Sequence, residues 1–209
     1  PDRIRCFSYR HIPADFPHQA AINPQALPGA AETLTLFLRV VKELTQAGYV
    51  WIGAECFVRP GDEWALAQAE GRLHRNGIGF TALDSACQLA FGPHGNGEVD
   101  RLLVQNESDL DAWHQAVKAG HLPISWGHRL SDRDYRRRRA YEQLLCNLAL
   151  PRSSLDALDE DLPTLERFAA QGMLEMDADG LRVTPSGRFL LRSLCARLER
   201  SLNWDCRPW

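Results

Sequence analysis

Apolar residues recur at helical spacing early in the chain and predict a helix from about Ala31 to Ala47 that ends at Gly48. The residues with this spacing are Leu34, Phe37, Leu38, Val41 and Leu44. Ahead of the helix, residues 3–9 (RIRCFSY) alternate between apolar and polar side chains, which predicts a β-strand with neighbours on both sides. Residues 11–28 contain four prolines and no sustained period, which is typical of a long surface loop.

A second strand and a second helix follow directly. Residues 49–52 predict a short buried strand, and residues 63–70 predict a helix with an aspartate cap before it and a glycine after it. Residues 77–91 are apolar and rich in small side chains, which fits a further strand and turn. The glycine-rich segment 92–97 (GPHGNG) is predicted to be a loop. Alternating strands and helices indicate an α/β arrangement.

The pattern becomes mainly helical beyond residue 105, so we predict two domains, 1–105 and 106–209. The predicted elements are helices at 108–118, 131–148 and 162–171, a hairpin at 173–183 and a closing helix from Thr184. Ser108 and Ser131 occupy the expected cap positions. The residues that share one face of the closing helix are Phe189, Leu190, Leu194 and Leu198. Helices, a small hairpin and a last helix resemble a winged-helix domain.

The composition is that of an ordinary globular protein. A chain of 209 residues with 44% hydrophobic and 24% charged residues is long enough to bury a sizeable core. A formal charge of -3 gives no global reason to expect binding to nucleic acid or to a membrane surface. No apolar run approaches the roughly 18 residues of a spanning helix, and the N-terminus has no signal-peptide core. We therefore predict a cytoplasmic protein without membrane contact.

Cysteine and histidine spacing gives no metal motif. The cysteines lie far apart and mostly in apolar stretches, which is typical of reduced, buried thiols. They are Cys6, Cys56, Cys87, Cys146, Cys195 and Cys206, without any CxxC or CxxxCxxC. The histidines at 94, 114, 121 and 128 lack the spacing of a helical or finger-type metal site, so no metal ligand is predicted.

Three stretches carry short motifs in a fixed order. The first is YRHIP at 9–13, and the second combines FVRP at 57–60 with LHRN at 73–76. The third ends in a helical segment with TPSGR at 184–188. Together they resemble the C-terminal half of the oxygen-independent coproporphyrinogen III oxidases, which are radical S-adenosylmethionine enzymes of haem biosynthesis.

The resemblance implies late strand-helix units of a partial (β/α) barrel, followed by a small winged-helix-like domain. In such enzymes an iron-sulfur cluster reduces S-adenosylmethionine to a radical that attacks the propionate chains of coproporphyrinogen III. The cluster cysteines belong to the N-terminal half of the barrel, which we expect to be missing from this chain and to be its partner. The chain alone is expected to be inactive, so no catalytic residue is assigned.

The substrate class suggests which residues bind it. Coproporphyrinogen carries four carboxylates, and arginine binds carboxylates in a bidentate manner while apolar side chains cover the macrocycle. The substrate-binding residues implied by the resemblance are Arg59, His74, Arg75 and Asn76. The implied pocket wall consists of Glu55, Phe57, Phe80 and Thr81. The alternative is that the two arginines form local ion pairs with Asp62, Glu63 or Glu70.

Two departures from the family pattern leave other functions open. Residues 53–56 (GAEC) and the loop at 92–97 differ from the family, so an inactive member that binds haem or a porphyrin is an alternative. The arginines at 133 and 136–139 allow a nucleic-acid-binding winged helix, which the acidic cluster at 156–161 opposes. We expect these arginines to be partly solvated and partly paired with Asp132, Asp134 and Glu142.

Overall fold

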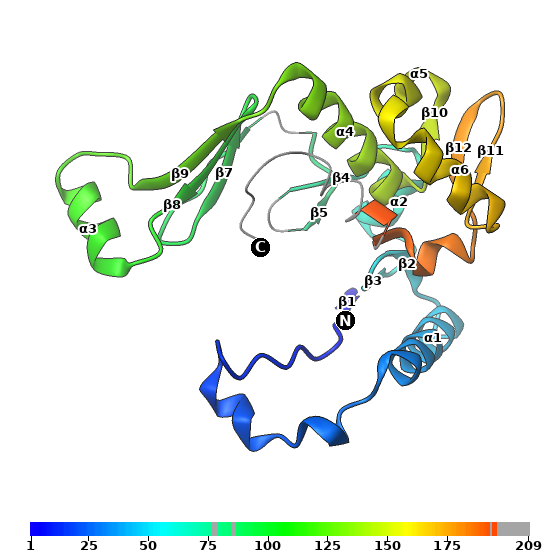
Figure 1. Ribbon diagram of the computed structural model, residues 1–209, viewed down its shortest axis with the longest axis horizontal. Coiled ribbons are helices and arrows are strands. Elements are labelled where there is room, and N and C mark those ends of the chain that lie inside the picture. Colours follow the sequence, from blue (N-terminus) through cyan, green and yellow to red (C-terminus); the bar gives the residue numbers. More distant parts are fainter. Residues whose placement is uncertain (77–78, 85–86, 193, 196–209) are drawn as a thin grey trace. The chain divides into compact units, whose positions relative to one another are not determined.

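The chain folds into a mixture of helices and short antiparallel sheets (Figure 1). This computed structural model describes the whole chain except for residues 77–78, 85–86, 193 and 196–209. It divides into two compact units, Pro1–Leu66 and Ala67–Trp209. The predicted domain boundary at residues 105–106 falls inside a strand of the second unit and stays a prediction.

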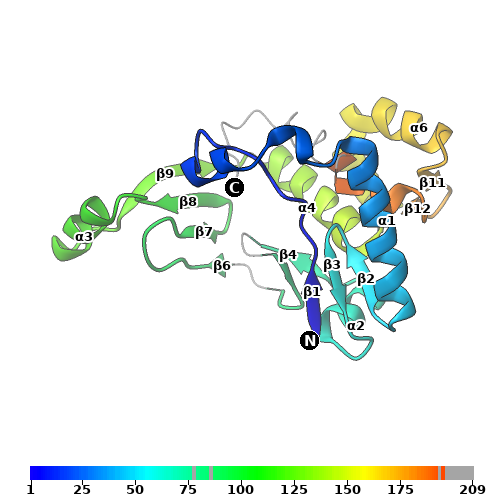
Figure 2. The same ribbon diagram turned by 90° about the horizontal axis from the view of Figure 1, so that it is seen from below.

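A three-stranded antiparallel sheet carries the first unit. Its strands are β1 (Arg3–Arg5), β2 (Val50–Gly53) and β3 (Cys56–Val58), in the order β1-β3-β2. Helix α1 (Ala30–Gln46) contacts β2, and Figure 2 shows the two side by side. The predicted first helix and the strand after it are confirmed.

Aromatic rings and aliphatic side chains fill the interior of this unit. Ile52, Phe57 and Val58 are fully buried, and the Phe57 ring stacks on Trp51 with 6.2 Å between centroids. Phe37 of α1 meets the Trp51 ring edge-on, with 5.9 Å between the ring centroids. The sheet and α1 therefore pack through one aromatic cluster.

The predicted loop at residues 11–28 is confirmed, and it contains two 3-10 turns, η1 (Pro17–Ala21) and η2 (Pro24–Ala26). Gln19 is buried, and its side-chain oxygen accepts from the Ile12 amide at 2.5 Å. The helix predicted at 63–70 is α2 (Glu63–Ala69), which follows β3, and Asp62 Oδ1 accepts from the Trp64 amide at 2.8 Å.

A hairpin and a larger sheet open the second unit. The hairpin pairs β4 (His74–Arg75) with β5 (Phe80–Thr81). The sheet has the order β6-β7-β8-β9 and is antiparallel throughout. Its strands are β6 (Cys87–Gln88), β7 (Asn96–Val99), β8 (Leu102–Asn106) and β9 (Ile124–Arg129). Figure 1 shows α3 (Leu110–Lys118) at one end of this sheet, where it connects β8 to β9.

Three predictions for this region are corrected. The loop at 92–97 is shorter, because β7 begins at Asn96 and Gly97 lies so close to the next strand that a Cβ would meet Val104 at 2.9 Å. The cap of α3 is Asp109, which accepts from the Ala112 amide at 2.8 Å, and not Ser108. The region after residue 105, which was predicted to be mainly helical, also contains β9, which pairs with β8.

The remaining described residues form a group of helices with a small three-stranded sheet. Its helices are α4 (Asp132–Asn147), α5 (Arg152–Leu155), the 3-10 segment η3 (Asp156–Asp161) and α6 (Leu162–Ala170). Its strands are β10 (Ala149–Pro151), β11 (Leu174–Met176) and β12 (Gly180–Val183), in the order β10-β12-β11. One cluster of buried apolar residues, including Leu144, Leu158 and Leu165, joins these elements.

The closing helix begins later than predicted. Thr184 lies outside regular structure, and the first helical turn is the 3-10 turn η4 (Gly187–Phe189). The Thr184 hydroxyl still acts as a cap, because it accepts from the Gly187 amide at 3.0 Å. Leu194 is buried as expected, whereas Leu198 lies outside the described residues.

Candidate functional site

The β4–β5 hairpin brings most of the predicted binding residues of the second unit together. His74 lies opposite Thr81, and Arg75 lies opposite Phe80. Asn76 shapes the turn, since its side-chain oxygen accepts from the Gly79 amide at 3.1 Å. The hairpin thus carries two of the predicted polar anchors side by side, with Asn76 at its end.

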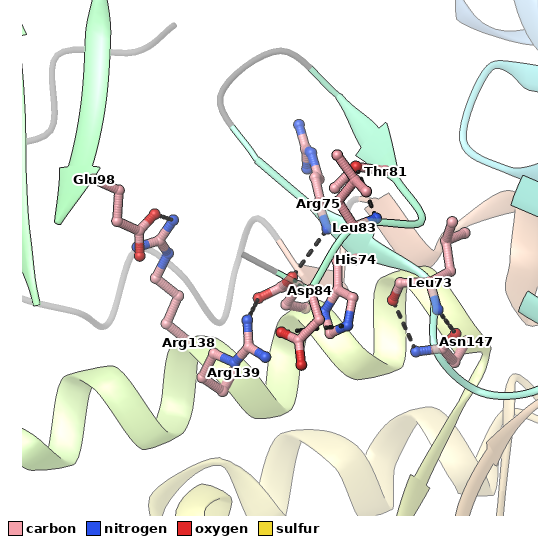
Figure 3. Close-up of polar contacts among 11 residues, drawn as sticks. Leu73, His74, Arg75, Thr81, Leu83, Asp84, Glu98, Arg138, Arg139 and Asn147 are labelled. Carbon is pink, nitrogen blue, oxygen red and sulfur yellow. Dashed lines mark hydrogen bonds and ion pairs between the residues drawn. The ribbon is translucent and has the colours of Figure 1, made fainter. Parts of the chain in front are cut away.

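Helix α4 lies under this hairpin and holds its main chain. Asn147 bonds both main-chain groups of Leu73: its Oδ1 accepts from the amide at 3.0 Å and its Nδ2 donates to the carbonyl at 3.1 Å. Glu142 Oε1 accepts from the Arg75 amide at 2.9 Å. The Leu73 side chain is only 1% exposed. Figure 3 shows these contacts between strand and helix.

Two carboxylates lie near the His74 ring. Its Nδ1 lies 3.6 Å from Glu142 Oε1, and its Nε2 lies 3.8 Å from Asp84 Oδ1. Glu142 Oε2 accepts in turn from Arg139 Nη1 at 2.9 Å. Arg138 forms a bidentate pair with Glu98, with both distances at 2.8 Å. The cations of α4 that face the hairpin are therefore already neutralised by carboxylates.

Arg75 differs from these arginines. Within the part of the chain that the structure describes, its guanidinium lies within ion-pair distance of no carboxylate. Figure 3 shows its side chain pointing away from α4. A cavity of about 40 Å³ lies beside it, lined also by His74, Glu98 and Arg138. A space of that size takes one small polar group, whereas a macrocycle needs at least about 300 Å³.

The other predicted residues belong to the first unit. Arg59 lies over the Tyr49 ring, with 4.3 Å between the guanidinium carbon and the ring centroid. Glu55 is paired with Arg5 at 3.2 Å. Phe57 is fully buried within its own unit. The roles of these residues in substrate binding stay predictions.

The local ion pairs considered for Arg59 and Arg75 are not found among the described residues. Asp62 and Glu63 pair instead with Arg3, at 2.7 and 2.8 Å. Glu70 pairs with Arg72, which lies two residues away. Asp62, Glu63 and Glu70 therefore pair with other arginines and form no ion pair with Arg59 or Arg75.

The basic run on α4 is partly paired, as predicted, but mostly with other acids than expected. Glu142 does pair with Arg139, whereas Asp132 pairs with Arg101 and Asp134 bonds the cap Ser131. The further pairs of the run are Arg133–Glu160, Arg137–Asp161 and Arg138–Glu98. This neutralisation removes much of the positive charge that binding to nucleic-acid phosphates would need.

Sequence reasoning overlooked two residues that organise the site. Glu142 was expected only as an ion-pair partner, yet it also bonds the hairpin main chain. Asn147 gives no signal in a single sequence, because its partner Leu73 lies 74 residues earlier. Only the fold brings the two together.

The described residues do not offer a site for a metal cluster. They contain no group of three or more His, Cys, Asp or Glu side chains that could hold a metal ion. Burial raises the pKa of Cys146 well above its ordinary value, so this thiol is protonated and inert. Cys206 lies outside the described residues. None of the described helices is long and apolar enough to cross a bilayer.

Comparisons with known proteins give one consistent family. The family model of the HemN C-terminal domain matches residues 130–190. The oxygen-independent coproporphyrinogen III oxidase of Pseudomonas aeruginosa is 35% identical, and the match covers 97% of this chain and 46% of that protein. The oxygen-independent coproporphyrinogen III oxidase of Thermostichus vulcanus is 36% identical, and the match covers 97% of this chain and 66% of that protein.

A solved structure agrees with these matches. It is titled "Coproporphyrinogen III oxidase (HemN) from Escherichia coli is a Radical SAM enzyme", and it is 33% identical to this chain with a TM-score of 0.89. The match covers 96% of this chain and 48% of that structure, so the chain spans about half the length of most relatives it matches. The predicted mixed fold is confirmed. The chain belongs to the oxygen-independent coproporphyrinogen III oxidase family and corresponds to the C-terminal part of its members.

Proposed function

We propose that this chain forms the substrate side of a coproporphyrinogen III oxidase of haem biosynthesis and that Arg75 binds a propionate carboxylate of the tetrapyrrole. The observation that carries the proposal is the guanidinium of Arg75, which has no carboxylate partner among the described residues and faces away from α4. The names of the relatives supply the substrate class, a tetrapyrrole with four carboxylates.

The neighbouring charges favour Arg75 as the carboxylate-binding group. Arg138 and Arg139 are each engaged by an acid, so an incoming carboxylate would have to displace Glu98 or Glu142. Arg75 requires no such displacement. A guanidinium binds a carboxylate through two parallel hydrogen bonds, which lysine does not reproduce.

The redox part of the reaction is not assigned to this chain. In a radical S-adenosylmethionine enzyme the cofactor and its cluster supply the radical. The described residues do not provide the donor set of a cluster, and the sequence lacks CxxxCxxC. The chain's own residues therefore bind and orient the substrate carboxylates, and the N-terminal half of the barrel is the proposed partner. The cytoplasmic location predicted from sequence stays a prediction.

Titration of the purified chain with coproporphyrin III, the stable oxidised form of the substrate, tests the proposal by its absorbance change. Arg75→Ala is expected to weaken binding about tenfold or more, because a charge-assisted contact contributes about 1.5–3 kcal/mol. Arg72→Ala is the matched control, since Arg72 is a nearby arginine that is paired with Glu70. It should leave the affinity unchanged.

The tetramethyl ester of coproporphyrin III separates carboxylate recognition from adhesion of the macrocycle. The ester keeps the ring and removes all four charges, so it should bind much more weakly than the free acid. Equal affinity of the wild-type chain for both ligands, or an unchanged affinity in Arg75→Ala, would contradict the proposal.

A further inference from the structure

The strand that carries His74 and Arg75 is too short to hold its own position. It contains two residues, and its partner β5 also contains two. An isolated two-stranded hairpin is at best marginally stable in water. Its contacts with α4 must therefore determine where the two side chains point.

Asn147 makes two hydrogen bonds to Leu73, the residue just before this strand. Its amide accepts from the nitrogen of Leu73 and donates to the oxygen of the same residue, at 3.0 and 3.1 Å. Two hydrogen bonds to one peptide residue fix its distance from the helix and also its rotation. Asn147 is the last residue of α4, and Leu148 ends the helix in the left-handed conformation with φ 59°. The amide is thus attached to a firmly defined helix end.

Glu142 attaches the strand to α4 at a second point, and the residue spacing along the strand matches the residue spacing along the helix. It accepts from the amide of Arg75, two residues beyond Leu73. Alternate residues of a strand lie about 6.6 Å apart along its axis, and five residues of an α-helix rise about 7.5 Å. Asn147 can therefore face Leu73 while Glu142 faces the amide of Arg75.

We propose that Asn147 is a positioning residue for carboxylate binding, because it sets the orientation in which β4 presents Arg75. This inference rests on the function proposed above. Among the described residues, the Asn147 side chain bonds only the main chain of Leu73, and it acts through Arg75. It also lies within residues 130–190, so this part of the chain has a direct role in arranging the site.

A double-mutant cycle with Arg75 tests this role. Coproporphyrin III is titrated into the wild-type chain, Asn147→Ala, Arg75→Ala and the double variant. Asn147→Ala is expected to weaken binding about five- to tenfold, and this loss should disappear when Arg75 is already alanine, because residues that act through one another are not additive. A role in overall stability would not produce this coupling.

Two further variants and one further measurement complete the design. Asn147→Asp is almost isosteric, keeps the acceptor for the Leu73 amide and is expected to lose affinity only partly, which covers the case in which alanine prevents folding. Gln143→Ala, on the α4 surface that lines a cleft with Ser153 and Ser154, should leave the affinity unchanged. Hydrogen exchange at the Leu73 amide should become faster in Asn147→Ala.

The results separate the two proposals. Faster exchange at Leu73 with unchanged affinity, or an equal loss of affinity with and without Arg75, overturns the positioning role and leaves the proposed function intact. Absence of coproporphyrin III binding by the wild-type chain overturns the proposed function and, with it, this inference.

Discussion

Arg137 and Asp161 form a buried ion pair in the second unit, at 2.7 Å and with side chains that are 4% and 9% exposed. Tyr141 donates its hydroxyl to the same carboxylate. Burial raises the pKa of Tyr141 well above its ordinary value, so the hydroxyl stays protonated and remains a donor. The three side chains connect α4 to the end of η3.

Asp161→Ala is expected to destabilise the protein by about 3–5 kcal/mol, because it removes the carboxylate that pairs with the buried Arg137 charge. Urea unfolding measures this loss. Asp159→Ala is the control, since Asp159 belongs to the same 3-10 segment and is exposed. A loss of less than about 1 kcal/mol in Asp161→Ala would contradict the structural importance of the pair.

Sequence identified the hairpin residues His74, Arg75 and Asn76, because they form one contiguous motif. It did not identify Asp161 as a structural counterion, because the carboxylate lies 24 residues from Arg137 and reads as part of an exposed acidic run. The contact of Asn147 with Leu73 is missed for the same reason. Long-range pairing depends on the fold and leaves no local pattern.

The elements themselves were predicted well where their pattern is long. Helices α1, α4 and α6 agree with the predicted ranges to within a residue or two. One strand that was not predicted is β9, which lies in the region that was predicted to be mainly helical. β7 was not predicted because Asn96 and Gly97 favour turns. A glycine is needed at position 97 because Val104 and the Gln88 carbonyl approach closely there.

The cap of α3 gives a test at the level of a single helix. Asp109→Ala is expected to destabilise α3 by about 1 kcal/mol, because the Ala112 amide loses its acceptor. Faster hydrogen exchange of the amides in the first turn of α3 would report the loss. Ser108→Ala, one residue earlier, should have little effect. The opposite order of the two effects would restore Ser108 as the cap.

The second unit contains a complete apolar core of its own. The buried cluster runs from Ala140 to Cys195 and draws on every helix of this domain from α4 onward. A core built within one segment of chain is the usual property of a segment that folds alone. The second unit is therefore expected to stay folded when most of the first unit is removed.

A fragment of residues 60–209, which retains α2 and its cap Asp62, should fold and unfold cooperatively. Thermal unfolding followed by near-ultraviolet circular dichroism measures this, with the full chain as the reference. A fragment that keeps its helical signal but loses its near-ultraviolet signal and binds a hydrophobic dye would show that the core needs the residues removed.

The contact between Asn147 and Leu73 has a consequence for how relatives can diverge. It involves main-chain atoms of Leu73, which every amino acid except proline provides in full. Exchange of Leu73 for another apolar residue of similar volume can therefore leave the attachment unchanged, whereas exchange of Asn147 removes it. When relatives are compared, an amide side chain at position 147 indicates that the hairpin is attached to the helix in the same way. The identity of the side chain at position 73 indicates little about this attachment.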